Sequence, residues 1–296
     1  MSKIICFGSL NIDKVYQVPH IVRPGETLSG TAFEVGCGGK GGNQSVALGR
    51  AGAKAMHAGC VGSDGTVLID NLQKSGVDTS LIRIVDQPTG HAIIQVDSDG
   101  QNSIILFPGA NHAVTEDMID QVIAVAEPGD YILLQNEINL NAKIIEKSSH
   151  AGLITCLNFA PFDTASAQKL PLEKIDILIV NEHEGAGLTG TENPDKIIYS
   201  LLQKYPNMTV VLTLGADGVI CGRGGELLRE PVYDTGKVID TTAAGDTFTG
   251  YFLEALVRGI DLKHCLERAS KAAGITVSRP GAADSIPFSN EIEDCN

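Results

Sequence analysis

An acidic residue directly follows a run of small residues in the segment Asp240-Thr-Thr-Ala-Ala-Gly-Asp246-Thr-Phe. Hydrophobic residues at helical spacing continue from Phe248 to Val257, so Asp246 is expected in the first turn of a helix. The first backbone N–H groups of a helix have no intrahelical partner, and the helix dipole adds positive potential at that end. This end is therefore predicted to bind an anion, because only small side chains cover its donors: Ala243, Ala244 and Gly245.

The Asp246 carboxylate would repel such an anion unless it faces a second reactant. Phosphoryl transfer to a hydroxyl meets this condition, because the reaction needs a base for the alcohol and positive dipoles for the transferred group. The alternative is a carboxylate that only stabilises the helix N-terminus, which contributes about 0.3–1 kcal/mol. The segment by itself favours this alternative, since aspartate is common in first helical turns, so the rest of the chain must decide.

The composition narrows the class of protein. With 296 residues, 43% hydrophobic and 20% charged, the chain has the profile of a soluble globular protein. A net charge of −14 argues against a nucleic-acid-binding surface, and no apolar stretch is long enough to span a membrane. The seven cysteines are scattered singly, which favours reduced thiols in a cytoplasmic protein over disulfides or a zinc site.

Strands and helices alternate from residue 53 to residue 214, after a buried strand at residues 3–8. This rhythm predicts an α/β fold, namely a doubly wound, mostly parallel central sheet with helices on both faces. Two strand pairs interrupt it, within residues 14–35 and 91–107, the second joined at Asp99-Gly100, a strong hairpin signal. We expect one domain over residues 1–296, with a small β-sheet lid formed by about 12–36 and 88–108.

Polar residues recur where the predicted strands end. In an open α/β sheet the carboxyl ends of the strands meet at the edge where ligands bind. Separately, each of these side chains has the alternative of capping a helix or a turn, and for Asn11 and Asp13 the two interpretations are equally supported. Together they predict a binding edge whose members are Asn11, Asp13, Asn136, Glu137, Asn158, Asn181, Glu184 and Thr213.

The glycine cluster Gly36-Cys-Gly-Gly-Lys40-Gly-Gly-Asn43-Gln44 also requires an interpretation. Its letters satisfy G-x-G-x-x-G, but the cluster does not follow the first strand and lacks the acidic residue of dinucleotide folds. The cluster does not match the Walker P-loop motif either, because Gly41 stands where Ser or Thr should follow the lysine. The cluster is instead expected to bring its backbone, Lys40 and Asn43 against a polyhydroxyl ligand; the alternative is a tight strand-to-helix turn.

These motifs, in this order, resemble the ribokinase-like carbohydrate kinases of phosphofructokinase-B type over essentially the whole chain. The resemblance implies ATP-dependent phosphorylation of a sugar primary hydroxyl, the 5-hydroxyl of D-ribose, with Asp246 as general base and the 243–246 backbone as anion hole. The sugar-binding positions would be Asn11, Asp13, Gly39, Lys40, Asn43 and Glu137. The ATP and Mg²⁺ positions would be Asn181, Glu184, Thr213, Gly215, Gly218, Gly245 and Ser270.

The resemblance also implies a K⁺ activator and a homodimer formed through the lid. The K⁺ ligands would be Asp240, Thr242 and Ser285, with the backbone carbonyls of Thr276, Arg279 and Gly281. The cysteine directly before the glycine cluster, Cys37, also resembles the pattern of deoxyribose kinases. The alternative is therefore a kinase of the same fold acting on 2-deoxyribose, another pentose or hexose, or a nucleoside. A non-catalytic sugar-binding protein is a third hypothesis, disfavoured by the intact 243–246 segment.

Overall fold

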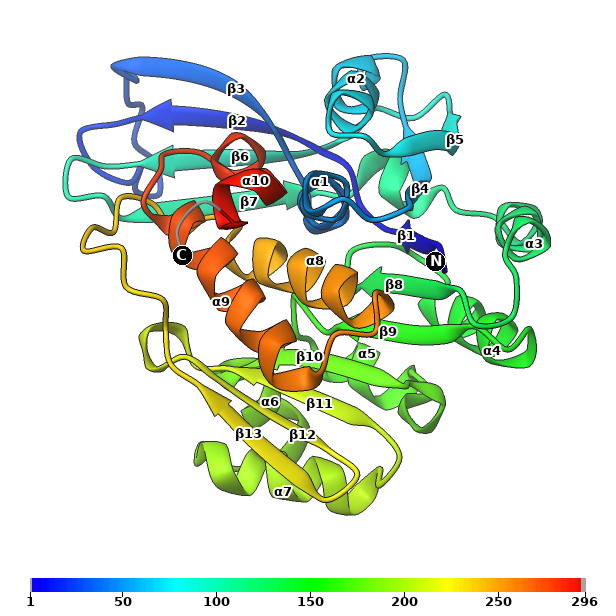
Figure 1. The fold of residues 1–296 in the computed structure, drawn as a ribbon. Coiled ribbons are helices and arrows are strands. Elements are labelled where there is room, and N and C mark those ends of the chain that lie inside the picture. Colours follow the sequence, from blue (N-terminus) through cyan, green and yellow to red (C-terminus); the bar gives the residue numbers. More distant parts are fainter. Residues whose placement is uncertain (1, 294–296) are drawn as a thin grey trace.

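A sheet of nine strands forms the centre of the protein in the computed structural model, which describes residues 2–293 (Figure 1). The strand order is β13-β12-β11-β10-β9-β8-β1-β4-β5. Every neighbouring pair from β11 to β5 is parallel, whereas the pairs β11–β12 and β12–β13 are antiparallel. The strands are β1 (Ile4–Phe7), β4 (Ala55–Val61), β5 (Asp78–Ile84), β8 (Tyr131–Gln135), β9 (Ile154–Asn158), β10 (Ile177–Asn181), β11 (Thr209–Thr213), β12 (Val219–Arg223) and β13 (Glu226–Glu230).

Helices cover both faces of this sheet, which confirms the predicted doubly wound α/β fold. Strand β1 shows the two layers, because Ile4 and Cys6 enter one hydrophobic core while Ile5 and Phe7 enter the other. The first core is closed by α1 (Lys40–Ala51), α2 (Thr66–Lys74), α8 (Ala244–Val257) and α9 (Leu262–Val277). The second is closed by α3 (Glu116–Val125), α4 (Asn141–His150), α5 (Thr164–Lys169), α6 (Glu182–Thr189) and α7 (Pro194–Lys204).

A separate sheet of four strands stands off the main one (Figure 1, upper left). Its order is β3-β2-β6-β7, and the β6–β7 hairpin turns at the predicted Asp99-Gly100. Its members are β2 (Asn11–Gln17), β3 (Ala32–Gly38), β6 (Gly90–Val96) and β7 (Asn102–Phe107), so the two predicted strand pairs form one sheet. Its closure over a ligand stays a prediction.

The C-terminal third contains elements that the sequence pattern did not predict, namely the β12–β13 hairpin, α9 and the short α10 (Ser289–Glu293). Strand β13 is largely exposed and charged, so it lacks the hydrophobic run that marked the parallel strands. Within residues 2–293 no helix has the length and apolar character needed to cross a membrane. The cytoplasmic location stays a prediction.

Helices α1 and α8 lie in close contact, and this contact positions the polar residues described below. A Cβ atom on Gly250 of α8 would lie 2.4 Å from the Ala47 Cβ and 2.9 Å from the Leu48 nitrogen of α1. The N-terminal turn of α1 is packed just as tightly, since a Cβ on Gly41 would lie 2.5 Å from the Ser9 nitrogen after β1. Glycine at these two positions therefore lets α1 pack closely against the middle of α8 and against the segment after β1.

Candidate active site

Asp246 lies in the first turn of α8, as the helical spacing predicted, and its side chain points to the start of α1. Its Oδ2 accepts a hydrogen bond from Asn43 Nδ2 at 3.0 Å, and its Oδ1 accepts one from Gln44 Nε2 at 2.8 Å. The residue is only 8% exposed. Asp246 is thus a buried carboxylate held by two neutral amides from α1, in addition to its place in the first turn of α8.

The predicted anion hole is the N-terminus of α8. Ala243 precedes the helix in the left-handed conformation, with φ of 62°, which costs a non-glycine residue about 1–2 kcal/mol. Thr247 N donates to Ala243 O, while the Ala244 amide makes a 3.3 Å bond to Thr241 O. The amides of Gly245 and Asp246 lie in the first turn, where no intrahelical carbonyl is available, so they are the donors best placed for an anion.

Glu137 connects the loop after β8 to the glycine cluster. Its Oε2 accepts hydrogen bonds from Ser9 Oγ at 2.5 Å and from the Lys40 amide at 3.1 Å. Ser9 Oγ in turn accepts from the Gly41 amide at 3.2 Å. Ser9 was not predicted as a site residue, although it lies at the carboxyl end of β1, the same signal that selected Asn11.

Asn11 and Asp13 lie on strand β2 of the small sheet rather than in a loop. With Lys40, Asn43, Glu137 and Asp246 they form the group of polar side chains that we call the polar pocket. Asn11 Oδ1 accepts from Asn111 Nδ2 at 2.7 Å, and the Leu10 amide donates to Asn111 Oδ1 at 2.9 Å. A Cβ on Gly38 would lie 2.1 Å from Asp13 Oδ2, so the Asp13 carboxylate rests on that glycine. Asn111 was not predicted, because it lies outside any strand end.

The charges of this pocket act on one another. Burial lowers the pKa of Lys40, but the carboxylates of Asp246, Glu137 and Glu184 raise it by more, so the net pKa is raised and the ammonium is retained. Burial, followed by the charge of Glu137, raises the pKa of Asp13 to about 6. The pocket therefore concentrates several carboxylates around one lysine, an arrangement suited to hydroxyl groups of a neutral ligand.

A cavity of about 490 Å³ borders the α8 N-terminus, where Ala244 and Gly245 line it. Every nucleotide-side residue predicted near the phosphates and the base, apart from Asn181 and Glu184, lines it: Thr213, Gly215, Gly218, Gly245 and Ser270. Its apolar walls were not predicted, because they come from a loop and two helices far apart in sequence: Val232, Val238, Phe248, Ala273 and Val277. An apolar slot beside free amides fits a flat base attached to phosphates.

Asn181 and Glu184 do not line this cavity. They form a reciprocal capping box at the start of α6, in which Asn181 Oδ1 accepts from the Glu184 amide and Glu184 Oε2 accepts from the Asn181 amide, each at 2.9 Å. Burial is the largest influence on the pKa of Glu184 and raises it. The capping alternative is thus realised for this pair, and Glu184 Oε1 also accepts a hydrogen bond from Asn181 Nδ2 at 3.0 Å.

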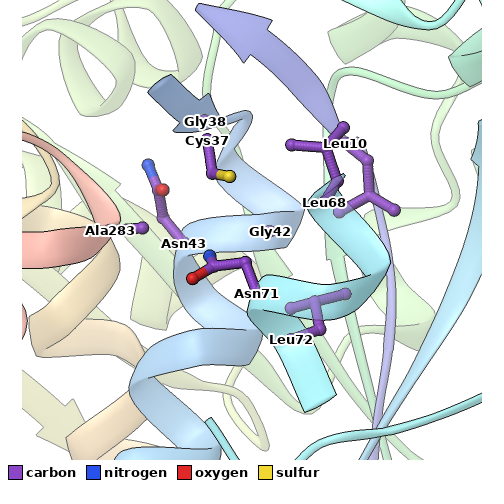
Figure 2. A pocket seen from close by; sticks show the side chains of 9 residues that line it. All are labelled: Leu10, Cys37, Gly38, Gly42, Asn43, Leu68, Asn71, Leu72 and Ala283. Atoms are coloured by element: carbon purple, nitrogen blue, oxygen red, sulfur yellow. The ribbon is translucent and has the colours of Figure 1, made fainter. Parts of the chain in front are cut away.

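A crevice behind the glycine cluster separates α1 from α2 and β3 (Figure 2). Figure 2 shows Cys37 above Leu68 and Leu72, with Ala283 approaching Asn43 from the C-terminal segment. The crevice has no room for a water molecule, so it is a packing seam and not a ligand site.

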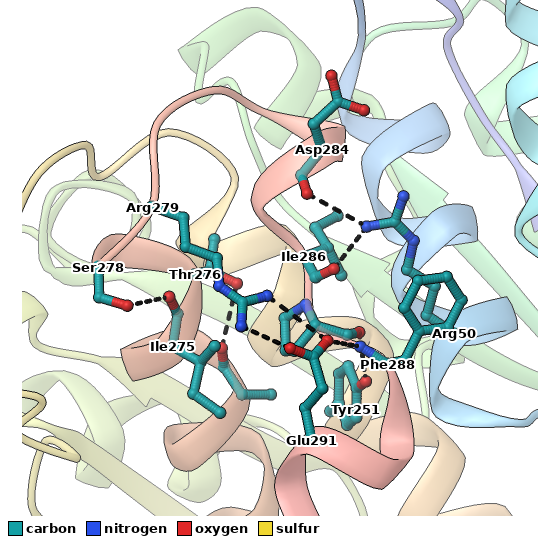
Figure 3. Close-up of polar contacts among 12 residues, drawn as sticks. Arg50, Tyr251, Ile275, Thr276, Ser278, Arg279, Asp284, Ile286, Phe288 and Glu291 are labelled. Atoms are coloured by element: carbon teal, nitrogen blue, oxygen red, sulfur yellow. Dashed lines mark hydrogen bonds and ion pairs between the residues drawn. The ribbon is translucent and has the colours of Figure 1, made fainter.

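The segments predicted to hold K⁺ come together beside the α8 N-terminus. Asp240 Oδ1 accepts from the Thr242 amide at 2.9 Å, and its Oδ2 accepts from the Gly281 amide at 3.1 Å. The Arg279 guanidinium pairs with Glu291 (Figure 3), and the role of the Arg279 carbonyl stays a prediction. Ser285 Oγ donates to Ala282 O at 2.7 Å.

Two buried amides complete the site and were not predicted: Gln44, next to Asn43 on α1, and Gln135, at the carboxyl end of β8. Gln135 Nε2 donates to Gln44 Oε1 at 2.6 Å. The strand-end signal that selected Asn158 applies equally to Gln135, whereas Gln44 is distinguished only by its place in the α1–α8 contact.

Comparison with known proteins gives one consistent family. Residues 1–289 match the pfkB family of carbohydrate kinases. The chain is 38% identical to a ribokinase of Haemophilus influenzae, over 96% of this chain and 95% of that protein. Two solved structures are similar over 99% of this chain, with TM-scores of 0.87: a Cryptococcus neoformans ribokinase in complex with ADP, 34% identical over 99% of its length, and an Arabidopsis thaliana ribokinase complexed with ribose and ATP, 29% identical over 98%.

Replacing Asp13 by Asn is expected to stabilise the protein above pH 6. The pKa of Asp13 rises from 3.8 to about 6 on folding, so the folded state holds the proton more tightly and stability declines as pH rises from about 4 to about 6. The variant avoids this decline, which amounts to about 2–3 kcal/mol. Urea unfolding from pH 4 to pH 8 measures it, with the exposed Asp99→Asn as control. If the free energy of unfolding changed with pH in the same way for the wild type and Asp13→Asn, the prediction would be contradicted.

Proposed function

The chain belongs to the pfkB family of carbohydrate kinases, as its motifs predicted, and on this premise we propose that it transfers the γ-phosphoryl group of ATP to the 5-hydroxyl of D-ribose. The observation that carries the proposal is the position of Asp246. Its carboxylate is bound from the α1 side by Asn43 and Gln44, while the adjoining Gly245 lines the 490 Å³ cavity. The base thus stands between a polar pocket and a nucleotide-sized cavity.

In the proposed mechanism, the polar pocket holds the sugar and the cavity holds the nucleotide. Asn11, Asp13, Asn43 and Glu137 offer oxygens and amides to several sugar hydroxyls, and Asp246 accepts the proton of the attacking hydroxyl. The first-turn amides of α8 receive the phosphoryl oxygens as charge moves onto them. The Lys40 ammonium, kept protonated by the surrounding carboxylates, adds positive charge to the same space.

Mg²⁺ and K⁺ belong to the proposal. Mg²⁺ would neutralise phosphate charge, with its waters on the Glu184 carboxylate; this fits a cation that keeps most of its waters. K⁺ would support the α8 N-terminus electrostatically. The oxygen-rich set around Asp240 and Gly281 fits a cation bound mainly by carbonyls: the Asp240 carboxylate, the Thr242 and Ser285 oxygens, and the carbonyls of Thr276, Arg279 and Gly281.

Replacing Asp246 by Asn should lower turnover by orders of magnitude while leaving the fold intact. The neutral side chain has the same shape but accepts no proton, so kcat is expected to fall by about 10²–10⁴-fold. ADP release with ribose, ATP and Mg²⁺ measures kcat, and calorimetry measures ribose binding, which should persist. Asp195→Asn is the matched control, because it removes a first-turn carboxylate from α7, away from the site. Near-normal turnover in Asp246→Asn would remove Asp246 from the mechanism.

The acceptor is expected to be ribose in preference to 2-deoxyribose. A site built to bond a hydroxyl is left with unpaired buried polar groups by an analogue that lacks it, so kcat/KM for ribose should exceed that for 2-deoxyribose by at least about tenfold. A panel of pentoses, hexoses and nucleosides with ATP, run with and without K⁺, measures this. A higher kcat/KM for 2-deoxyribose or a nucleoside would replace ribose as the proposed acceptor. Equal rates with and without K⁺ would contradict the proposed activation by K⁺. No ADP release with any sugar would favour a non-catalytic binding protein.

A second copy of this chain is proposed to cover one face of the small sheet. The strand register places five exposed apolar side chains on the face opposite Asn11 and Asp13: Tyr16, Phe33, Val35, Ile105 and Phe107. Phe33, Val35 and Ile105 are 53%, 59% and 60% exposed. Such a contiguous patch is unusual on a monomer, and the family relationship supports a homodimer formed through this sheet.

Light scattering should therefore give twice the 31.2 kDa chain mass for the wild type. Phe33→Lys combined with Ile105→Glu places charges in the apolar face and should halve that mass. Tyr199→Lys, which changes an exposed aromatic residue on α7, is the control and should remain dimeric. A monomeric wild type would overturn the proposed dimer and leave the kinase proposal standing.

A further inference from the structure

Gln44 is fully buried between the base and the end of the central sheet. Its Nε2 donates two hydrogen bonds, to Asp246 Oδ1 at 2.8 Å and to Asn158 Oδ1 at 2.9 Å. Its Oε1 accepts from Gln135 Nε2 at 2.6 Å. All the principal hydrogen-bonding capacity of this carboxamide is therefore used inside the protein, and none is left for a ligand.

The polarity of this chain of amides follows from its first member. An ionised carboxylate only accepts hydrogen bonds, so Asp246 requires the nitrogen of Gln44 to face it. The Gln44 oxygen must then face Gln135, which in turn must present its nitrogen. Asn158 presents its oxygen to Gln44 while its nitrogen bonds Ile179 O at 3.3 Å. Each group in the chain thus has one permitted orientation.

The far end of the chain is fixed by packing. Gln135 is fully buried on β8, and a Cβ on Gly8 would lie 2.2 Å from its Oε1 and 2.7 Å from the Gly41 Cα. The carboxamide therefore occupies the space that a side chain at position 8 would need. Its Nε2 also lies 3.5 Å from Cys6 Sγ. Gln135 is thus held between Gly8, Cys6 and Gln44, and we take it as the reference point for the Gln44 carboxamide.

We propose that Gln44 and Gln135 are positioning residues, a two-amide relay that holds the Asp246 carboxylate in the orientation in which it accepts the sugar proton. This inference rests on the proposed kinase function and adds to it two residues that touch neither sugar nor nucleotide. A relay of neutral amides orients the carboxylate without neutralising it, whereas a cation at Gln44 would reduce its basicity. Misplacement of a reacting group by about 1 Å costs roughly 10²-fold in rate.

The first test uses two isosteric variants, Gln44→Glu and Gln135→Glu, in the full-length protein. Gln44→Glu places a second carboxylate against Asp246; kcat for ribose should fall by about 10²-fold, and the acid limb of the kcat–pH profile should move up by about one unit. The carboxylate introduced by Gln135→Glu does not touch Asp246. It can only accept hydrogen bonds, whereas Gln44 Oε1 needs a donor at this position. The Gln44 carboxamide should then turn its oxygen towards Asp246, so kcat should fall as well, with KM for ribose little changed.

Ser45→Ala is the matched control, because it removes a buried hydrogen bond from the next residue of α1, the 2.7 Å contact with His57 of β4, and leaves both carboxamides in place. It should lower the melting temperature and leave the pH profile unchanged. The rate losses of Gln44→Glu and Gln135→Glu should also be far from additive in the double variant, since both act through one carboxamide. Additive losses, or a Gln135→Glu enzyme with normal kcat, would overturn the relay.

A melting experiment tests the contact without relying on activity. The loss of melting temperature in Gln44→Glu should grow as pH rises from 5 to 8, because two carboxylates then face each other. Adding Asp246→Asn should recover most of that loss, since the amide introduced at position 246 then donates to the glutamate. No recovery would overturn the relay. A wild type that releases no ADP with any sugar would overturn the proposed function, whereas an active wild type with normal Gln44→Glu and Gln135→Glu profiles would overturn the relay alone.

Discussion

The contact between the N-terminal turns of α1 and α8 is the constraint on which the rest of the site depends. Asn43 and Gln44 reach Asp246 only because Gly250 lets α8 approach the α1 backbone. One helix presents the residues proposed to bind the sugar, and the other presents free amides and a carboxylate. Both helices pack into the same hydrophobic core, so the geometry of the reacting groups is set by core packing, which tolerates little displacement.

The site concentrates negative charge in a partly buried space, and this has a cost in stability. Asp13 is shifted to a pKa of about 6 by burial and by Glu137, so its ionised form disfavours the folded state near neutral pH. Lys40 is the cation that offsets these carboxylates. Binding residues that oppose folding are typical of sites preorganised for a ligand, because the ligand supplies the hydrogen bonds that the empty pocket lacks.

The hydrophobic pattern was a good guide to the parallel part of the fold, where each strand is buried on both faces and reads as a short apolar run. It said little about β13, whose side chains are mostly exposed. It predicted the small sheet from its two strand pairs, but not which strands are neighbours in that sheet, since β2 and β6 pair across more than seventy residues. Pairing between distant strands depends on the twist and packing of the whole chain, which no local spacing encodes.

The sequence by itself determined the groups that we propose to react: an acid after three small residues at a helix start, polar side chains at strand ends, and a glycine cluster proposed to bring backbone close to a ligand. Those features are local, because backbone conformation and helix termini depend on neighbouring residues. Only the tertiary structure decided that Gln44 and Gln135 stand behind Asp246, that Asn181 and Glu184 cap α6, and that apolar residues from a loop and two helices form one cavity. Such relations join residues up to about two hundred positions apart, and they exist only once the two faces of the sheet have been packed.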